Sequence, residues 1–234
     1  MAEMKPQTYR DERPAEYFTR FHERARSNRQ GGWVYFLARC LVTPPTMLLY
    51  RVRQIGRKNV PTTGPVILAP NHFSQMDHFF CGVYLRRNIR YMAKSQMFGV
   101  PVITWIIYRG GAFPVRRGNK DEEAIITARE VLRHGNVLLI YAEGGRSRSG
   151  ELGEPRPGVG RVAVESGVPV VPVALHGSER VRGWKRLSFP RVTVQYGEPL
   201  SFEKNPDAGP EEWNATAHRI FDRVREMHES LAAR

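Results

Sequence analysis

Three features are scarce or missing in this chain of 234 residues, and each excludes a class of protein. Its two cysteines, Cys40 and Cys81, are too few for a disulfide framework, and their apolar neighbours predict buried thiols. No cluster of histidine, cysteine and carboxylate residues has the spacing of a zinc site, so neither a metal nor a cofactor is expected. The chain also lacks internal repeats and low-complexity tracts, which indicates one domain with appendages.

Long hydrophobic runs are missing as well. The most apolar stretch, residues 33–50, contains Arg39 and the pair Pro44-Pro45. These residues argue against a spanning helix, which needs about 20 mostly apolar residues. We expect two short helices that meet near the prolines and lie in a membrane interface; the alternative is that they pack on the core. The side chains expected at the lipid headgroups are Trp33, Tyr35, Tyr50, Arg39, Arg51 and Arg53.

Acidic residues are few relative to basic ones. The chain has 36 Lys and Arg against 23 Asp and Glu, a net charge of +13 and a pI near 10.2. This excess favours an anionic partner, which could be nucleic acid, an anionic membrane surface or a phosphorylated substrate. A basic nucleic-acid-binding module is therefore an alternative, but no helix-turn-helix, finger or aromatic RNA-binding signature is present, so no nucleic acid is expected. Residues 1–29 are polar and charged, so no secretory signal peptide is expected.

From Ile55 onward, apolar runs alternate with helical patterns. This alternation predicts an α/β fold with a mostly parallel central sheet flanked by helices, preceded by the N-terminal helical hairpin. We expect two regions, membrane-interface helices in residues 1–54 and an α/β domain in residues 55–234. The expected strands are Val66–Ala69, Ile89–Ala93, Ala112–Val115, Val137–Tyr141, Val168–Leu175 (awkward at Pro172, which predicts a bulge or strand end) and Arg191–Tyr196. The expected helices are Ser74–Leu85, Ser95–Ile107, Asp121–His134, Gly158–Glu165 and a terminal helix from Pro210.

One seven-residue segment, residues 71–77, follows the first of these strands and holds His72 and Asp77. A histidine oriented by a carboxylate can remove a proton from a hydroxyl near neutral pH. Five residues of regular helix turn through about 140°, so the two side chains meet only if the chain bends between them. Ser74 as N-cap with Asp77 at the third helical position supplies such a bend; the alternative is a capping box with an incidental histidine. No serine or cysteine elbow accompanies the pair, which points to a base acting on the substrate's own hydroxyl.

Three later segments, together with this one, resemble the glycerolipid acyltransferase family, in the family's order. Asn71, His72 and Asp77 match its first motif, Asn-His-x-x-x-x-Asp. The other blocks are Gly111-Ala112-Phe113-Pro114-Val115-Arg116-Arg117, Glu143-Gly144-Gly145-Arg146-Ser147 and Val168-Pro169-Val170-Val171-Pro172-Val173. Two residues depart from the pattern: Gly145 replaces the usual threonine, and Arg116 stands where an aspartate is common. Both departures leave the acceptor lipid less defined.

The resemblance and the residue chemistry together predict a site. His72 is the expected base, and Asp77 is expected to fix its tautomer. By resemblance, the second and third blocks hold a glycerol phosphate, which suits the paired donors of Arg117 and Arg146. The other expected substrate-binding residues are Glu143 (to orient an arginine or bond a hydroxyl, unless it is plain loop structure), Gly144, Gly145 and Lys94.

The predicted function is transfer of a fatty acyl group from acyl-CoA or acyl carrier protein to 1-acylglycerol 3-phosphate (lysophosphatidic acid), giving phosphatidic acid. The resemblance implies work at a membrane, and we expect peripheral or monotopic attachment to its cytoplasmic face. Acyl carrier protein is a candidate partner, because it is acidic and the chain is basic. Three alternatives stay open: another acceptor (glycerol 3-phosphate, a different lysophospholipid or a glycolipid), the nucleic-acid module, and a lipid-binding relative without activity.

Overall fold

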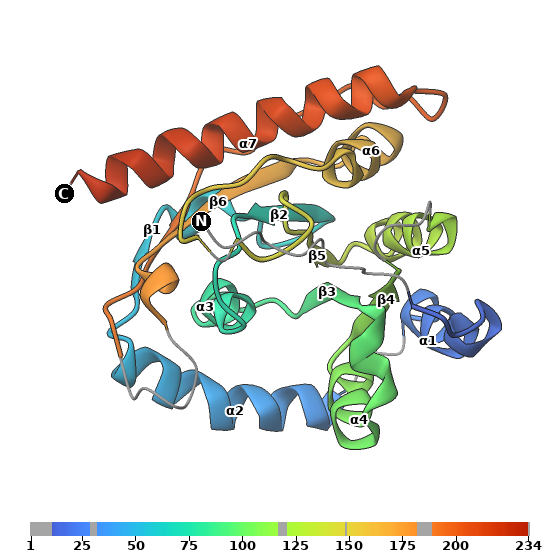
Figure 1. The fold of residues 1–234 in the computed structure, drawn as a ribbon, viewed down its shortest axis with the longest axis horizontal. Coiled ribbons are helices and arrows are strands. Elements are labelled where there is room, and N and C mark those ends of the chain that lie inside the picture. Colours follow the sequence, from blue (N-terminus) through green and yellow to red (C-terminus); the bar gives the residue numbers. More distant parts are fainter. Residues whose placement is uncertain (1–10, 29–31, 117–120, 148, 182–188, 234) are drawn as a thin grey trace, which may run out of the picture.

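Seven short strands form one sheet in the computed structural model, which describes residues 11–28, 32–116, 121–147, 149–181 and 189–233 (Figure 1). In spatial order the sheet is β1-β7-β6-β2-β5-β3-β4, and every neighbouring pair is parallel except β6 and β7. The predicted mostly parallel α/β sheet is thereby confirmed. The strands are β1 (Arg53–Ile55), β2 (Val66–Pro70), β3 (Ile89–Lys94), β4 (Ala112–Val115), β5 (Val137–Leu139), β6 (Val170–His176) and β7 (Thr193–Tyr196).

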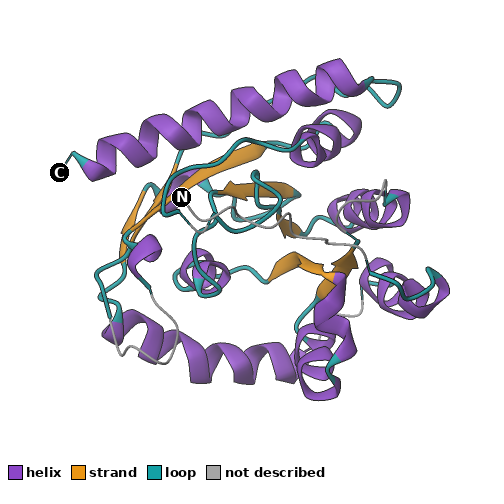
Figure 2. Cartoon of the chain, in the orientation of Figure 1, coloured by secondary structure: helices purple, strands orange, loops and turns teal. Residues whose placement is uncertain are grey.

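Helices cover both faces of this sheet (Figure 2). Apolar side chains of α5, α6 and α7 pack on one face, and those of α3 and the segment after α2 pack on the other. Because β2, β5 and β6 lie between these two layers, their residues are almost all buried, as expected for central parallel strands. The helices are α1 (Glu16–Arg26), α2 (Gly32–Leu49), α3 (Asp77–Gly82), α4 (Pro101–Arg109), α5 (Glu122–Arg133), α6 (Pro157–Ser166) and α7 (Pro210–Ala232). Single 3₁₀ turns are η1 (Arg57–Asn59), η2 (Ser95–Gly99) and η3 (Ser178–Arg180).

The parallel pairing gives the sheet one functional edge. Strands β6, β2, β5, β3 and β4 are neighbours and run in the same direction, so the segments that follow them emerge along a single edge. Those segments begin after His176, Pro70, Leu139, Lys94 and Val115. The carboxyl edge of an open parallel sheet is the usual place for a ligand. The sheet therefore gathers the first and third motif segments and the end of the second at one edge, whereas the fourth, residues 168–173, leads into β6 and forms its first part.

Helix α2 differs from the predicted pair of short helices. It continues as one helix through Pro44 and Pro45, so the expected break there was wrong. Each proline forfeits a backbone hydrogen bond, but the end of α2 is anchored because Tyr50 and Val52 lie in the core beside Phe80. This anchoring outweighs the local tendency of the prolines to break the helix.

Several side chains expected at lipid headgroups contact the protein body. Tyr50 is buried, the hydroxyl of Tyr35 accepts a hydrogen bond from Ile89 N at 3.1 Å, and Arg39 donates to the Leu85 carbonyl. The headgroup assignment of Tyr50 was wrong, while Tyr35 and Arg39 are half-buried and bonded to the fold, so their assignment stays a prediction. Trp33 is exposed. Of the two cysteines, Cys81 is fully buried as predicted, whereas Cys40 is exposed, so the prediction of a buried thiol at Cys40 is wrong.

Helix α1 packs on the body of the protein. Phe18 and Phe21 are buried beside Phe98, and the Tyr17 hydroxyl donates to the Phe98 carbonyl at 2.8 Å. The core-packing alternative therefore holds for α1. The division at residue 54 stays a prediction, and α1 is joined by packing to elements that follow that boundary.

Two further differences between the predicted and the observed elements occur at prolines. The helix expected over residues 95–107 is split at Val100, which is extended (φ −102°, ψ 113°) because Pro101 follows it. Pro172 lies inside β6 and not at a strand end; there the antiparallel partner loops out, between the pairs Val173–Tyr196 and Val170–Leu200. Between these two pairs, three residues of the partner segment lie opposite two residues of β6. The ladder of hydrogen bonds is already irregular there, so the N–H that proline lacks removes no ladder bond. Strand β6 thus continues through Pro172, and the irregularity lies in the segment after β7.

The contact between α6 and α7 leads to a stability prediction. A Cβ atom added at Gly160 in α6 would lie 2.0 Å from the Trp213 carbonyl oxygen in α7. Gly160→Ala is therefore expected to lower the free energy of unfolding by about 3 kcal/mol, because backbone atoms of two packed helices must separate. Urea titration with a circular dichroism readout measures this loss.

Gly158 in the same helix provides the matched control. Nothing lies within 4 Å of a Cβ placed there, so Gly158→Ala is expected to leave stability equal or slightly higher. Equal stability of the two variants would contradict the close α6–α7 packing.

Candidate active site

The turn after β2 brings His72 and Asp77 into contact. The chain leaves the sheet at Pro70, turns, and enters α3 at Asp77. This bend places His72 Nδ1 2.9 Å from Asp77 Oδ2, with Asp77 fully buried and the His72 side chain one-tenth exposed. The sequence expectation that a bend unites the two residues is met. The pair lies at the carboxyl edge of the sheet, beside the central strands.

The Asp77 carboxylate also organises the turn itself. Its Oδ2 accepts hydrogen bonds from the backbone N–H groups of Phe73 at 2.7 Å and Ser74 at 2.8 Å. The Ser74 hydroxyl in turn accepts from Met76 N at 3.2 Å. The bond from Ser74 N to Asp77 is one half of a capping box, but the Ser74 hydroxyl accepts from Met76 N and not from Asp77 N. Helix α3 begins at Asp77, so the helix start expected at Ser74 was three residues too early. One carboxylate thus both fixes the backbone and holds the imidazole.

Glu143 binds backbone groups of the site. Its Oε1 accepts from the backbone N–H of His72 at 2.8 Å, and its Oε2 accepts from Gly153 N at 2.8 Å. It is buried, and each of its oxygens accepts from a main-chain donor, so its bonds among the described residues hold the loop; the expectation that it orients an arginine or bonds a substrate hydroxyl stays a prediction. Burial raises the pKa of the Glu143 carboxyl, and the two N–H donors partly offset that rise. The residue connects the motif turn to the loop after β5.

The main chain and ring of His72 are held from several sides. The His72 carbonyl accepts a hydrogen bond from Ser147 N at 2.8 Å, and the His72 N–H donates to Glu143. The loop after β5 therefore binds both backbone polar groups of the histidine. The ring stacks on Tyr141, with centroids 3.6 Å apart and planes 13° apart. Tyr141 had not been singled out from the sequence; its one local signal is an aromatic side chain just beyond the apolar β5 run. The imidazole is thereby confined to one orientation.

Asn71 has a purely architectural position. Its side-chain amide accepts from Leu175 N at 2.7 Å and donates to Leu175 O at 3.0 Å. Both bonds are buried, and they join the start of the motif turn to the end of β6. An asparagine is suited to this place, because one planar amide can satisfy both the donor and the acceptor of a strand residue.

The predicted phosphate ligands lie along the same edge of the sheet. Lys94 ends β3 and is half-buried, and Arg146 is exposed in the loop after β5. Arg117 lies outside the described residues. Its neighbour Arg116 is tied to Asp121, which accepts from the Arg116 backbone N–H at 2.7 Å and lies 3.6 Å from its guanidinium.

The two loop glycines have unequal roles. Gly144 has φ +66°, and a Cβ added there would lie 2.9 Å from the Arg156 side chain, so glycine suits both the backbone and the space. Gly145 is half-buried next to it. The tight turn at Gly144 directs the chain from Glu143, behind the His72 backbone, out to Arg146 on the surface.

The fold and the site together define a class: an α/β protein that presents a buried histidine–aspartate pair at the carboxyl edge of a parallel sheet. The sequence profile described as Acyltransferase matches residues 51–176, which include this pair, Lys94 and residues 143–146. The chain belongs to the acyltransferase family.

Relatives of this chain include 1-acyl-sn-glycerol-3-phosphate acyltransferases and glycerol-3-phosphate acyltransferases, the latter for example in Pseudomonas syringae pv. syringae. It is 27% identical over 150 residues to a chloroplastic 1-acyl-sn-glycerol-3-phosphate acyltransferase of Arabidopsis thaliana, covering 63% of this chain and 42% of that protein. It is 27% identical over 184 residues to the 1-acyl-sn-glycerol-3-phosphate acyltransferase of Bacillus subtilis, covering 77% and 89%. The chain thus spans less than half of the plant relative but most of the bacterial one.

A solved structure supports the fold. The crystal structure of the 1-acyl-sn-glycerophosphate acyltransferase PlsC of Thermotoga maritima superposes with a TM-score of 0.64, covering 94% of this chain and 90% of that one at 23% identity. At this identity the similarity establishes the shared fold.

Proposed function

We propose that this protein transfers an acyl group from an acyl thioester to the free hydroxyl of 1-acylglycerol 3-phosphate, forming phosphatidic acid. The observation that most strongly supports this proposal is the 2.9 Å contact between His72 Nδ1 and Asp77 Oδ2 within a family-matched segment. The names of the relatives support the choice of acceptor. The donor is acyl-CoA or acyl carrier protein, both of which are acidic and complement the +13 net charge.

The chemistry follows from the orientation of the imidazole. When His72 Nδ1–H donates to Asp77, Nε2 is the basic nitrogen of the ring. Nε2 takes the proton of the acceptor hydroxyl while the hydroxyl oxygen attacks the thioester carbonyl. Asp77 stabilises the imidazolium that forms, and the proton then passes to the leaving thiolate. The ester bond forms, the thioester bond breaks, and no acyl-enzyme is required, so both substrates bind together.

The positioning of His72 favours this reaction. Glu143 and Ser147 hold its backbone, and Tyr141 covers one face of its ring. A base that is already oriented loses little entropy when the acceptor binds, which lowers the barrier to proton transfer. Most of the ring is buried, which also restricts its motion.

A membrane surface would deliver both lipids to this site. None of the helices in the described residues is long and apolar enough to cross a membrane. Instead, large apolar side chains are exposed on two neighbouring elements, α2 and the η2–α4 segment. These side chains are Trp33, Phe36, Leu37, Leu41, Leu48 and Leu49, and Met97, Val100, Val102, Ile103, Trp105 and Ile106. We define them as the α2–α4 apolar surface.

An apolar surface of this extent on a basic protein suits an anionic bilayer. Its side chains can enter the acyl region while nearby cations contact headgroups, as for interfacial helices. Arg51 is exposed just beyond α2, and Arg109 ends α4. We propose peripheral or monotopic attachment through this surface, on the cytoplasmic face of the membrane.

The phosphate of the acceptor leads to the test of substrate choice. Arg146→Gln is expected to raise KM for 1-acylglycerol 3-phosphate by about 10-fold or more, because a charged hydrogen bond contributes about 1.5–3 kcal/mol. KM for acyl-CoA is expected to stay unchanged. Initial rates with labelled acyl-CoA measure both constants, and Lys94→Gln is examined in parallel.

A panel of acceptors completes this test. Wild-type protein is expected to acylate 1-acylglycerol 3-phosphate in preference to glycerol 3-phosphate, other lysophospholipids, a glycolipid and the phosphate-free 1-acylglycerol. Arg133→Gln, an exposed arginine on α5, is the matched control and should behave as wild type. Equal use of phosphorylated and phosphate-free acceptors would reject the assigned acceptor, and a changed KM for acyl-CoA alone would reject the assigned role of Arg146.

A further inference from the structure

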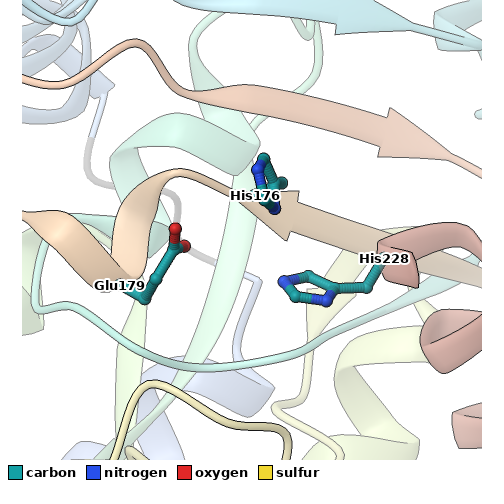
Figure 3. Close-up of side chains that lie close together, drawn as sticks. All are labelled: His176, Glu179 and His228. Carbon is teal, nitrogen blue, oxygen red and sulfur yellow. The ribbon is translucent and has the colours of Figure 1, made fainter. Parts of the chain in front are cut away.

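Three side chains with metal-ligating groups converge at the carboxyl edge of the sheet, next to the motif turn. His176 is the last residue of β6, Glu179 lies in η3, and His228 projects from α7 (Figure 3). One ligating atom from each residue lies within 4.8 Å of the other two. The residues are 3 and 49 positions apart, so no local sequence pattern brings them together. The fold alone creates this cluster.

Each of the three residues contains a buried polar atom that has no hydrogen-bond partner among the described residues. These atoms are Nδ1 of His176, Oε2 of Glu179 and Nε2 of His228. A buried polar group without a partner is destabilising, and such groups are few in native proteins. Three of them at one place indicate a shared ligand that satisfies all of them.

The backbone around the cluster is tightly constrained. Gly177, between His176 and η3, has φ +90°, and a Cβ there would lie 2.1 Å from the Arg191 carbonyl oxygen. The preceding strand is fixed by the Asn71–Leu175 bonds described above. His176 and Glu179 are therefore presented from a turn of defined geometry, as a preformed ligand set requires.

We propose that His176, Glu179 and His228 form a binding site for a divalent transition-metal ion, zinc by preference. Two imidazoles and one carboxylate are a common zinc ligand set, and a water molecule takes the fourth tetrahedral position. Ligands around zinc stand about 3.4 Å apart, so rotations of these side chains close the present separations of up to 4.8 Å. Glu179 can bind through Oε2, because Oε1 faces Arg180 at 3.3 Å.

The charged side chains around the proposed site indicate which of the three ligands contributes most to metal binding. A cavity of about 200 Å³ next to the site is lined by Arg53, His176, Arg180 and Arg191, and it offers room for the water ligand. The three arginines repel a cation, so the Glu179 carboxylate is the group that balances the metal charge. Loss of Glu179 is therefore expected to weaken binding most.

The bound metal would connect α7 to the catalytic region. The His228 ring lies 5.6 Å from the ring of Phe73, the residue after the proposed base. A metal ion joining β6, η3 and α7 would fix the end of α7 against the motif turn. The role proposed for this site is thus structural, and it does not depend on the acyltransferase reaction.

Zinc content and metal-dependent stability test the proposal. Untagged full-length protein is stripped with a chelator and titrated with zinc, followed by mass-spectrometric metal analysis and thermal unfolding. Wild type is expected to hold one zinc ion per chain and to unfold at a higher temperature with zinc. Glu179→Gln and His228→Gln are each expected to weaken affinity by at least about 10-fold, because loss of even an outer-shell partner costs 10- to 100-fold.

Matched controls separate this site from surface binding. The Cys40→Ser background removes the exposed thiol, and His218→Gln replaces an exposed histidine of the same helix α7. His218→Gln should bind zinc as wild type does. Unfolding of the metal-free variants verifies that each is folded. Wild type with no bound zinc, or equal zinc affinity in wild type and both ligand variants, would overturn the proposal.

Discussion

Replacing His72 with alanine is expected to lower kcat for acyl transfer by about 10²- to 10⁴-fold, the usual contribution of a general base. The acceptor hydroxyl would then have to lose its proton to water, which is a much weaker base than an imidazole. KM for both substrates should change little, because the imidazole acts on the proton in the transition state. Initial rates at saturating acyl-CoA and 1-acylglycerol 3-phosphate measure the loss.

Asp77, which holds the base, is expected to act together with His72 in catalysis. Asp77→Asn keeps one oxygen for the Phe73 and Ser74 amides but no longer supports the imidazolium, so kcat is expected to fall by about 10²-fold or more. The double variant should be no slower than His72→Ala alone, since residues that act together are not additive. His134→Ala, at the end of α5, is the control with wild-type rates. Losses that multiply in the double variant would contradict the coupled pair.

Polar substitutions on the α2–α4 apolar surface are expected to release the protein from vesicles. Leu41 and Leu48 are 65% and 77% exposed, and they stand two helical turns apart on one side of α2. The double variant Leu41→Gln/Leu48→Gln should bind vesicles of phosphatidylcholine and phosphatidylglycerol at least about 30-fold more weakly. Each of these side chains contributes roughly 1–2 kcal/mol when it is buried in the acyl region. Sedimentation with sucrose-loaded vesicles measures the change.

The second helix of this surface and an apolar control complete the experiment. Val102→Gln/Ile106→Gln on α4 should have a similar effect, because both helices would enter the same bilayer. Ile126→Gln removes an equally apolar exposed residue from α5, away from this surface, and is compared with the single variant Leu48→Gln. Full binding by both double variants would reject the surface, whereas the variants' unfolding midpoints should match that of wild type.

The hydrophobic pattern of the sequence predicted the strands, helices and turns that depend on interactions between nearby residues. The buried strands β2, β3, β4 and β6 could be recognised as apolar runs, and their helices by apolar periodicity. Residues 71–77 could be recognised as a bend, since the capping interaction lies within a few residues. The carboxyl-edge arrangement followed from the alternation of strands and helices, and the parallel sheet confirms it.

What the pattern could not predict depends on long-range contacts. Nothing in the sequence indicated that Glu143 accepts hydrogen bonds from the backbone N–H groups of His72, 71 residues away, and of Gly153. Tyr141 stacks on His72 only because the loop after β5 crosses the motif turn. Pro44 and Pro45 should break a helix locally, yet packing at the end of α2 maintains it. The His176, Glu179 and His228 cluster joins segments that share no spacing rule.

The central claim is that His72, held by Asp77, activates the hydroxyl of a lysophosphatidic acid directly. A single-turnover assay tests it most directly: excess wild-type or His72→Gln protein is mixed with labelled acyl-CoA, with and without 1-acylglycerol 3-phosphate. Wild type is predicted to form labelled phosphatidic acid only when the acceptor is present, with no label on the protein, and His72→Gln to form it at least about 100-fold more slowly. Equal rates in the two proteins, or label on the wild-type protein before acceptor is added, would contradict the account.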